Sequence, residues 1–210
     1  MTRLNLSLAC WGYDRTEALL SQTVRPDGID LNFQVLSVEE TFFRMLRNRE
    51  FDVAEMSLSS YTVSVARGNS PFIAIPVFPS RFFRHSCIFV SAKSGIEKPE
   101  DLVGKRIGVP EYQMTAPVWI RGILSDHYGV PVDSVSYWTG GEEEPGRPEK
   151  QKLNLPPNIK VNSIPEGQHR PELVSILPGF TMGKIIGKGA TVSVDVIKFL
   201  MRGRIKKVPR

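Results

Sequence analysis

Cysteine is scarce in this chain, which limits the ways in which the fold can be stabilised. The 210 residues include two cysteines, Cys10 and Cys87, too few for a disulfide framework and without metal-ligand spacing. No apolar run approaches the roughly 18 residues of a membrane-spanning helix. In the opening residues, Asn5 and Ser7 interrupt an apolar stretch that is already shorter than the about 7–15 residues of a secretory signal. We therefore expect this segment to be the first strand of an intracellular, cytoplasmic protein.

The chain also lacks an even distribution of positive charge. Its formal net charge is +5 at pH 7, yet residues 1–168 carry 18 Lys and Arg against 20 Asp and Glu, a net charge of −2. Residues 169–210 carry 9 against 2, a net charge of +7, so the whole excess lies there. A nucleic-acid-binding domain usually carries its basic surface on the folded part. The sequence therefore argues against a nucleic-acid partner, and it gives little support to a membrane partner.

Predicted strands and helices alternate through the first part of the chain, which is typical of a parallel α/β layer. Ser37 is expected to cap a helix, with Glu40 at the capping-box position three residues on. The expected strands are Leu4–Leu8, Ile29–Leu36, Phe51–Met56, Ile73–Phe78 and Cys87–Ser91, and the expected helices are Arg15–Thr23, Ser37–Asn48 and Ser57–Arg67.

A second predicted unit follows residues 93–95. Its expected elements are a turn or short helix over Pro99–Leu102, strands over Lys105–Val109, Val135–Thr139 and Ile159–Ser163, and a helix over Glu111–Tyr128. The segment Gly140–Pro157 is rich in glycine, proline and charge, so we expect a long surface loop there. Arg121, one to two turns into the helix, is expected to face solvent.

Cationic side chains lie before the predicted strand Cys87–Ser91, and a predicted helix starts after the strand Lys105–Val109. Arg81, Arg84 and His85 lie between apolar segments, and guanidinium groups offer paired donors for a carboxylate. The turn over residues 111–115 opens a predicted helix, where free backbone N–H groups favour an anion. Together these features predict a cleft for a carboxylate. The alternative for the turn is ordinary helix capping. The alternative for one of the arginines is a surface ion pair.

Several motifs resemble the 4,5-dihydroxyphthalate decarboxylase family, in the same order along residues 1–168: FDVAEMSLSSY, PFIAIPVFPSRFFRHS, DLVGKRIGVPEYQMTAPVWIRGIL and WTGGEEEPGRPE. The resemblance implies an α/β fold of two lobes, similar to type 2 periplasmic binding proteins. Family members are considerably longer, so we expect a truncated fold with an incomplete second lobe. The expected parts are a first α/β lobe over 1–92, a partial second α/β lobe over 93–168, and a basic tail over 169–210. We interpret this tail as foreign or frame-shifted sequence.

The reaction that the resemblance implies needs no cofactor. In 4,5-dihydroxyphthalate each carboxylate lies para to a ring hydroxyl, whose oxygen supplies electrons when the carbon bearing the carboxylate is protonated. Carbon dioxide then leaves and the ring becomes aromatic again. The protein must hold two carboxylates, ease the loss of a phenolic proton and deliver a proton to carbon. We expect no metal, because the adjacent carboxylates of 142–144 lack the spacing of a metal cage.

Two residues are candidates for the catalytic acid or base. His85 has a suitable intrinsic pKa, and Glu55 is an acidic residue within the predicted apolar strand Phe51–Met56. A structural histidine and a water-facing edge glutamate are the alternatives. The candidates for substrate binding lie at predicted strand ends or in the basic segment. They are Tyr13, Ser59, Ser60, Tyr61, Arg81, Arg84, Tyr112, Gln113 and Thr115.

The leading hypothesis is therefore cofactor-independent decarboxylation of 4,5-dihydroxyphthalate, or of a related hydroxylated aromatic dicarboxylate, to 3,4-dihydroxybenzoate. One alternative is a non-catalytic binding protein for a small aromatic carboxylate that shares the fold. Another is an inactive, truncated fragment of the enzyme. The expected partner is a small aromatic dicarboxylate, and an oligomer is compatible with the sequence.

Overall fold

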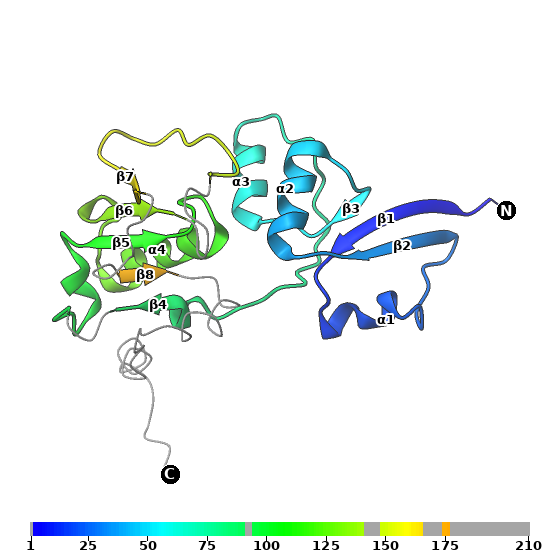
Figure 1. Ribbon diagram of the computed structural model, residues 1–210, viewed down its shortest axis with the longest axis horizontal. Helices are drawn as coiled ribbons and strands as arrows, with labels where there is room; N and C mark the ends of the chain where they lie inside the picture. The colour runs from blue at the N-terminus through cyan, green and yellow to red at the C-terminus, as the bar shows by residue number, and fades with distance from the viewer. Residues whose placement is uncertain (1, 91–93, 141–147, 166–173, 177–210) are drawn as a thin grey trace, which may run out of the picture. The chain divides into compact units, whose positions relative to one another are not determined.

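A computed structural model describes residues 2–90, 94–140, 148–165 and 174–176. The chain forms two compact units, Met1–Arg81 and Phe82–Arg210, and each contains a sheet of its own (Figure 1). The boundary between the units lies after Arg81, whereas the sequence analysis placed it after residue 92. Within the described residues, no helix combines the length and the apolar character needed to cross a bilayer.

The first unit is built on a three-stranded parallel sheet in the order β2-β1-β3. Its strands are β1 (Leu4–Cys10), β2 (Ile29–Val35) and the short β3 (Val53–Ala54). The helix α1 (Glu17–Leu20) follows a 3-10 turn over Asp14–Thr16, in place of the longer helix expected there. Two further helices are α2 (Val38–Asn48) and α3 (Leu58–Ala66), and α2 packs against β1 and β3.

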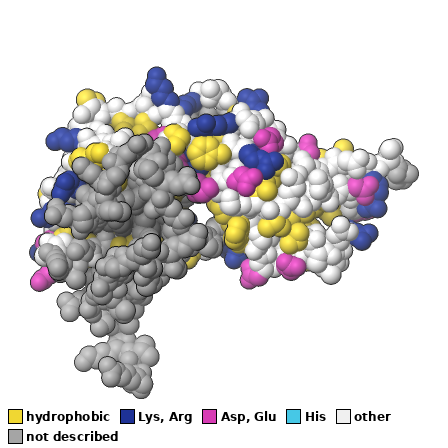
Figure 2. Space-filling view, in the orientation of Figure 1, with side chains coloured by type: hydrophobic (Ala, Val, Ile, Leu, Met, Phe, Trp, Pro, Cys, Tyr) yellow, Lys and Arg dark blue, Asp and Glu magenta, His cyan; other side chains and the backbone are white. Residues whose placement is uncertain are grey.

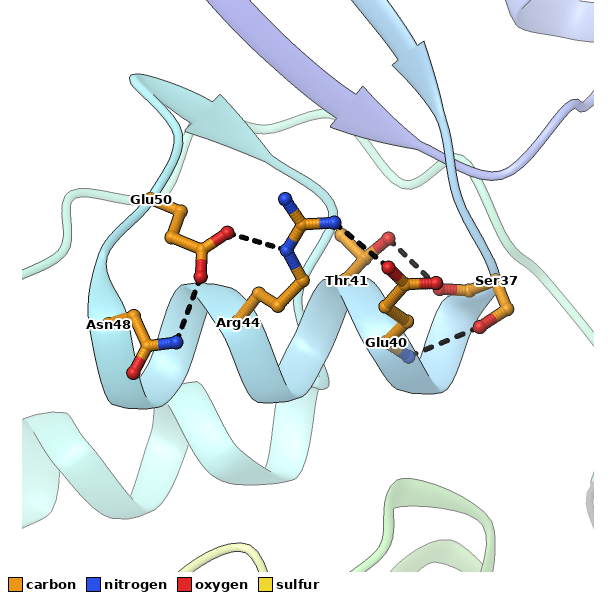
Figure 3. A network of polar contacts seen from close by, with 6 residues as sticks. All are labelled: Ser37, Glu40, Thr41, Arg44, Asn48 and Glu50. Atoms are coloured by element: carbon orange, nitrogen blue, oxygen red, sulfur yellow. Dashed lines mark hydrogen bonds and ion pairs between the residues drawn. The ribbon is translucent and has the colours of Figure 1, made fainter.

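The helix α2 begins and ends as its sequence indicates. The Ser37 side chain accepts a hydrogen bond from the Glu40 backbone N–H at 3.3 Å, so the predicted cap is present. The Arg44 guanidinium donates hydrogen bonds to the carboxylate of Glu40 at 2.8 Å and to that of Glu50 at 2.5 Å (Figure 3). Arg49 ends the helix in the left-handed conformation, with φ of 53°.

The predicted strand Ile73–Phe78 is absent. This segment has no ladder partner among the described residues, and its side chains are largely exposed, Ile73 to 95%. Pro71, Pro76 and Pro79 lack backbone N–H groups, which weakens any ladder that the segment could form. The apolar alternation was therefore not sufficient to make a strand. The predicted strand over Cys87–Ser91 is also shorter, because Arg84–Cys87 form a 3-10 helix ahead of β4 (Ile88–Phe89).

The second unit contains a five-stranded sheet in the order β4-β8-β5-β6-β7. Its parallel strands β5 (Arg106–Val109), β6 (Ser136–Thr139) and β7 (Lys160–Ser163) match the predicted ones. The helix α4 (Thr115–Tyr128) starts four residues later than expected and ends at Gly129, with φ of 64°. The buried apolar core gathers around the sheet and α4, and includes Ile107, Val109, Ile120, Leu124 and Tyr137.

One strand of this sheet lies in the segment that the sequence analysis treated as a basic tail. β8 (Val174–Ile176) pairs antiparallel with β4 and parallel with β5. Three residues of the predicted tail therefore belong to the fold of the second unit. On the face shown in Figure 2, lysine and arginine side chains of the described residues are interspersed with acidic and apolar ones.

Candidate functional site

In the first unit, the carboxyl ends of β1 and β3 bring Glu55 beside the end of the first strand. Ala9 and Ala54 are partners in the parallel ladder, and the Glu55 backbone N–H donates to the Ala9 carbonyl at 2.9 Å. The loop after β1 then returns Tyr13 to the same place. We refer to Cys10, Trp11, Tyr13 and Glu55 as the Glu55 cluster. It lies at the sheet edge where parallel α/β folds place their ligands.

The Glu55 carboxylate accepts from three different donors in this cluster. The Tyr13 hydroxyl donates to Oε1 at 2.7 Å. The Cys10 thiol lies 3.7 Å from Oε2, and the Trp11 backbone N–H donates to the same oxygen at 3.5 Å. Glu55 is therefore held by protein donors, so the alternative of a simple water-facing edge residue does not describe it.

Burial keeps the two side-chain donors of the cluster protonated. Tyr13 and Cys10 are 7% and 4% exposed. Desolvation, followed by the hydrogen bond to Glu55 and its charge, raises the pKa of Tyr13 well above its ordinary value. Desolvation and the charge of Glu55 raise the pKa of Cys10 to about 12. At neutral pH both groups are therefore hydrogen-bond donors to the carboxylate between them.

The predicted serines open α3 directly after the Glu55 cluster. Ser57 caps the helix by accepting from the Ser60 N–H at 3.4 Å, and the Ser57 and Ser59 hydroxyls lie 3.0 Å apart. All three serines are buried, whereas Tyr61 is half-buried. Capping accounts for Ser57, while Ser59 and Ser60 remain candidates for substrate binding at the carboxyl end of β3.

The basic segment divides between the two units. Arg81 is exposed and ends the first unit, whereas Arg84 and His85 belong to the 3-10 helix of the second. The Arg84 guanidinium lies 5.7 Å from the centre of the Phe82 ring. The His85 ring stacks on Phe83 at 5.0 Å and meets the edge of Tyr128 at 6.2 Å. Residues three apart on a strand face opposite sides, but Arg81 and Arg84 lie outside strands, so this limit does not apply to them.

In the second unit, the turn between β5 and α4 already holds a carboxylate. The backbone N–H groups of Tyr112 and Gln113 donate to the two oxygens of Glu149, the second at 3.2 Å. We refer to Tyr112, Gln113 and Glu149 as the Glu149 turn. Burial raises the pKa of Glu149, and the two backbone hydrogen bonds oppose this rise. These donors are the ones that the sequence analysis assigned to an anionic ligand.

A buried ion pair supports the Glu149 turn from the neighbouring residues. Lys150 Nζ lies 2.5 Å from Glu111 Oε1, and the two side chains are 3% and 1% exposed. The prediction that Gly140–Pro157 is a surface loop is therefore wrong at Lys150. A charged side chain in a segment rich in glycine and proline is usually solvated, but here Glu111 supplies a partner inside the protein.

Arg121 is also buried, at 8% exposure, so the expectation that it faces solvent is wrong. Its guanidinium donates to the Tyr112 carbonyl at 2.9 Å and lies 3.8 Å from the centre of the Tyr112 ring. The exposed side of α4 instead carries Val118 and Trp119. Gln113 is buried, and Thr115 is half-buried as the first residue of α4.

A cavity of about 640 Å³ in the first unit lies along β1, β2 and the loop after α1, and none of the predicted site residues lines it. Among the described residues, no group of three or more His, Cys, Asp or Glu side chains is arranged to hold a metal ion. The predicted site residues that come together are thus Tyr13 and Glu55 in one unit, and Tyr112 and Gln113 in the other.

Comparison with known proteins supports the resemblance. A family model described as "ABC transporter, phosphonate, periplasmic substrate-binding protein" matches residues 12–143. A 4,5-dihydroxyphthalate decarboxylase from Comamonas testosteroni is 49% identical over 168 residues, which are 80% of this chain and 51% of the relative. A protein of the same name from Pseudomonas putida is 45% identical over 190 residues, 90% of this chain and 72% of the relative. The chain belongs to the 4,5-dihydroxyphthalate decarboxylase family.

Its fold is correspondingly of the periplasmic-binding-protein kind, with parallel α/β layers in both units. The chain spans about half the length of the Comamonas relative. The match to the Pseudomonas decarboxylase covers 190 of 210 residues, so it includes part of 169–210 as well as the motifs in 1–168.

Within this decarboxylase-family chain, sequence reasoning missed Cys10, Glu149 and Lys150 as site neighbours. Cys10 could have been found, because it ends β1 at the edge where Glu55 follows β3. Glu149 and Lys150 gave no local signal, since they reach the Tyr112 turn across more than 35 residues of sequence.

Proposed function

We propose that this protein decarboxylates 4,5-dihydroxyphthalate, or a closely related hydroxylated aromatic dicarboxylate, to 3,4-dihydroxybenzoate. The observation that carries the proposal is the pair of a buried Tyr13 and a half-buried Glu55 at the carboxyl ends of parallel strands, in a chain that is 45–49% identical to proteins named 4,5-dihydroxyphthalate decarboxylase. The Tyr13 hydroxyl donates to the Glu55 carboxylate at 2.7 Å, which orients this carboxylate as a general base for the substrate.

The chemistry assigns a separate task to each group. Glu55 accepts the phenolic proton of the hydroxyl para to the departing carboxylate, which turns that oxygen into an electron donor. An acid protonates the ring carbon that bears the carboxylate, and His85 is our candidate for this acid. The carbon–carbon bond then breaks, carbon dioxide leaves, and its bonding electrons restore the aromatic ring. The phenolate that forms regains its proton from Glu55. The acid takes a proton from water to replace the one that it gave to carbon, so each turnover consumes one solvent proton and the cycle balances.

Tyr13 supports this role of Glu55 without titrating itself. Its hydroxyl stays protonated at neutral pH, because burial and the neighbouring carboxylate raise its pKa. It can therefore orient the carboxylate and stabilise its charge before the proton arrives. The ring of the substrate acts as the electron sink, so the reaction requires no electron-accepting cofactor.

A carbon dioxide release assay on the purified chain with 4,5-dihydroxyphthalate tests the proposal. We expect turnover in the wild type and a fall in kcat of about 100- to 10,000-fold in Glu55→Gln, which keeps the shape but cannot accept the proton. Glu17→Gln is the matched control, an exposed glutamate in the first turn of α1. Equal kcat values for Glu55→Gln and the wild type would remove Glu55 from the reaction.

The second candidate is a binding protein for a small aromatic carboxylate, and the match to a periplasmic substrate-binding family model favours it. The same preparation distinguishes the two functions. Saturable binding of 4,5-dihydroxyphthalate without carbon dioxide release would support the binding protein. An inactive fragment would give neither binding nor turnover.

A further inference from the structure

The Glu149 turn is notable because both oxygens of one carboxylate meet successive backbone N–H groups. Tyr112 donates to Oε1 and Gln113 to Oε2. This paired arrangement is how proteins commonly bind the carboxylate of a ligand through the main chain. Here a side chain of the same protein fills the position, more than 35 residues along the chain.

The surroundings of the turn carry fixed positive charge. Lys150 and Arg121 are both buried, at 8% exposure each. The described partners of the Arg121 guanidinium are the Tyr112 carbonyl and the rings of Tyr112 and Tyr137, at 3.8 and 5.4 Å. The negative charge of Glu149 acts on both cations. A buried cation is costly without an anion nearby. Lys150 has Glu111 as its partner, so a carboxylate at the turn mainly offsets the charge of Arg121.

Glu149 is held less firmly than its neighbours. It is half-buried, whereas Glu111 and Lys150 are almost fully enclosed. Desolvation acts against its ionised form, as the raised pKa shows. The Glu111–Lys150 pair would therefore keep the adjacent backbone in place if the Glu149 side chain turned away.

We propose that Glu149 is an internal substitute for a ligand carboxylate: it occupies the backbone donors of Tyr112 and Gln113, and a carboxylate of an aromatic substrate binds there by displacing it. This inference rests on the proposed function for the identity of the ligand. Whether the Tyr112 and Gln113 donors exchange one carboxylate for another can be tested by binding experiments, without the decarboxylation reaction.

Removal of the Glu149 side chain should leave the Tyr112 and Gln113 backbone N–H groups open to small carboxylates. We expect Glu149→Ala to lower the midpoint of thermal unfolding in chloride, and acetate at equal ionic strength to restore most of the loss. Wild type and Glu100→Ala, which removes an exposed glutamate of the same unit, should respond to acetate alike and weakly. The same small response in all three proteins would mean that the donors do not accept an exchangeable carboxylate, and would overturn the inference.

Binding of phthalate, measured by isothermal titration calorimetry, tests the competition itself. Without the internal competitor, we expect Glu149→Ala to bind phthalate about 10-fold more tightly than the wild type, since a charge-assisted hydrogen-bonded group no longer has to be displaced. Unchanged or weaker binding in a folded Glu149→Ala protein would show that Glu149 only ties the turn together.

If Glu149→Ala fails to fold, Glu149→Gln carries the test. It keeps the side-chain volume but loses the charge and presents one amide oxygen, so tighter phthalate binding than in the wild type is again expected. Equal or weaker binding would overturn the proposal. Carbon dioxide release by the wild type is scored independently. Acetate rescue and tighter phthalate binding without any turnover would refute the decarboxylase function alone, whereas turnover without either effect would refute only the role of Glu149.

Discussion

The buried pair formed by Glu111 and Lys150 gives the most direct physical test of the second unit. The two charged atoms lie 2.5 Å apart, and their side chains are 1% and 3% exposed. Lys150→Met keeps a long apolar side chain but leaves the Glu111 carboxylate without its cation inside the protein. Removing one partner of a buried pair typically costs about 3–5 kcal/mol. Because small domains are stable by only about 5–15 kcal/mol, this is a large fraction of the total.

Removal of both charges should be much less harmful than removal of one. The double variant Glu111→Gln, Lys150→Met eliminates the cost of taking two ions out of water together with their attraction, and these terms nearly offset each other in buried pairs. An exposed pair serves as the control. Arg3 and Asp30 lie 3.0 Å apart but are 48% and 57% exposed, so Asp30→Asn should cost at most about 1 kcal/mol.

Urea unfolding followed by tryptophan fluorescence measures all three variants, since Trp138 lies on β6 of the second unit and Trp11 directly follows β1 of the first. With a urea dependence of about 2 kcal/mol per molar, a loss of about 3 kcal/mol lowers the midpoint by roughly 1.5 M. The double variant should recover most of that shift. If Lys150→Met moves the midpoint no further than Asp30→Asn does, water reaches the pair in solution. The support that it gives to the Glu149 turn would then be lost.

Two further predictions concern ligand binding and pH. We expect Arg81→Ala and Arg84→Ala each to weaken binding of 4,5-dihydroxyphthalate by about 10-fold or more, because a lost charge-assisted bond costs roughly 1.5–3 kcal/mol; unchanged affinity in both would remove them from the site. The pKa of Asp101 is lowered by hydrogen bonds from the Glu97 and Lys98 backbone N–H groups, so its stabilising effect is present above its unfolded pKa and is lost as pH falls through the lower folded value. Asp101→Asn should therefore flatten the acid side of a plot of unfolding midpoint against pH, and an unaltered slope would contradict this assignment.

The local signals in the sequence predicted those elements whose residues determine their own structure. Ser37 caps α2, and the predicted strands β5 and β6 lie within a residue of their observed bounds. The segment Ile73–Phe78 failed because a strand needs a partner as well as an apolar pattern. The strand β8 was missed for the converse reason: the charge change in 169–210 indicated a separate tail, whereas residues 174–176 do find ladder partners in β4 and β5.

The candidate site shows the same division between local and long-range information. Position at a strand end was enough to select Tyr13 and Glu55 separately. The 2.7 Å contact between Tyr13 and Glu55 joins residues 42 apart in sequence, and it depends on the register of β1 against β3. The turn at Tyr112 and Gln113 was likewise predicted to favour an anion, but the anion that fills it comes from a segment with no local mark of burial.

The donors around Glu55 and Glu149 explain why we assign chemistry to the first and binding to the second. Glu55 receives hydrogen bonds from a phenol and a thiol, which stay protonated and orient the carboxylate, in addition to one backbone amide. The described donors to Glu149 are backbone amides, which do not give up their protons under these conditions. A carboxylate held only by amides can be replaced by another carboxylate of the same shape without any change in protonation. The carboxylate at the end of β3, held in one orientation by side-chain donors, is the group to which we assign proton transfer, and substitution of Glu55 should therefore change kcat before it changes substrate affinity.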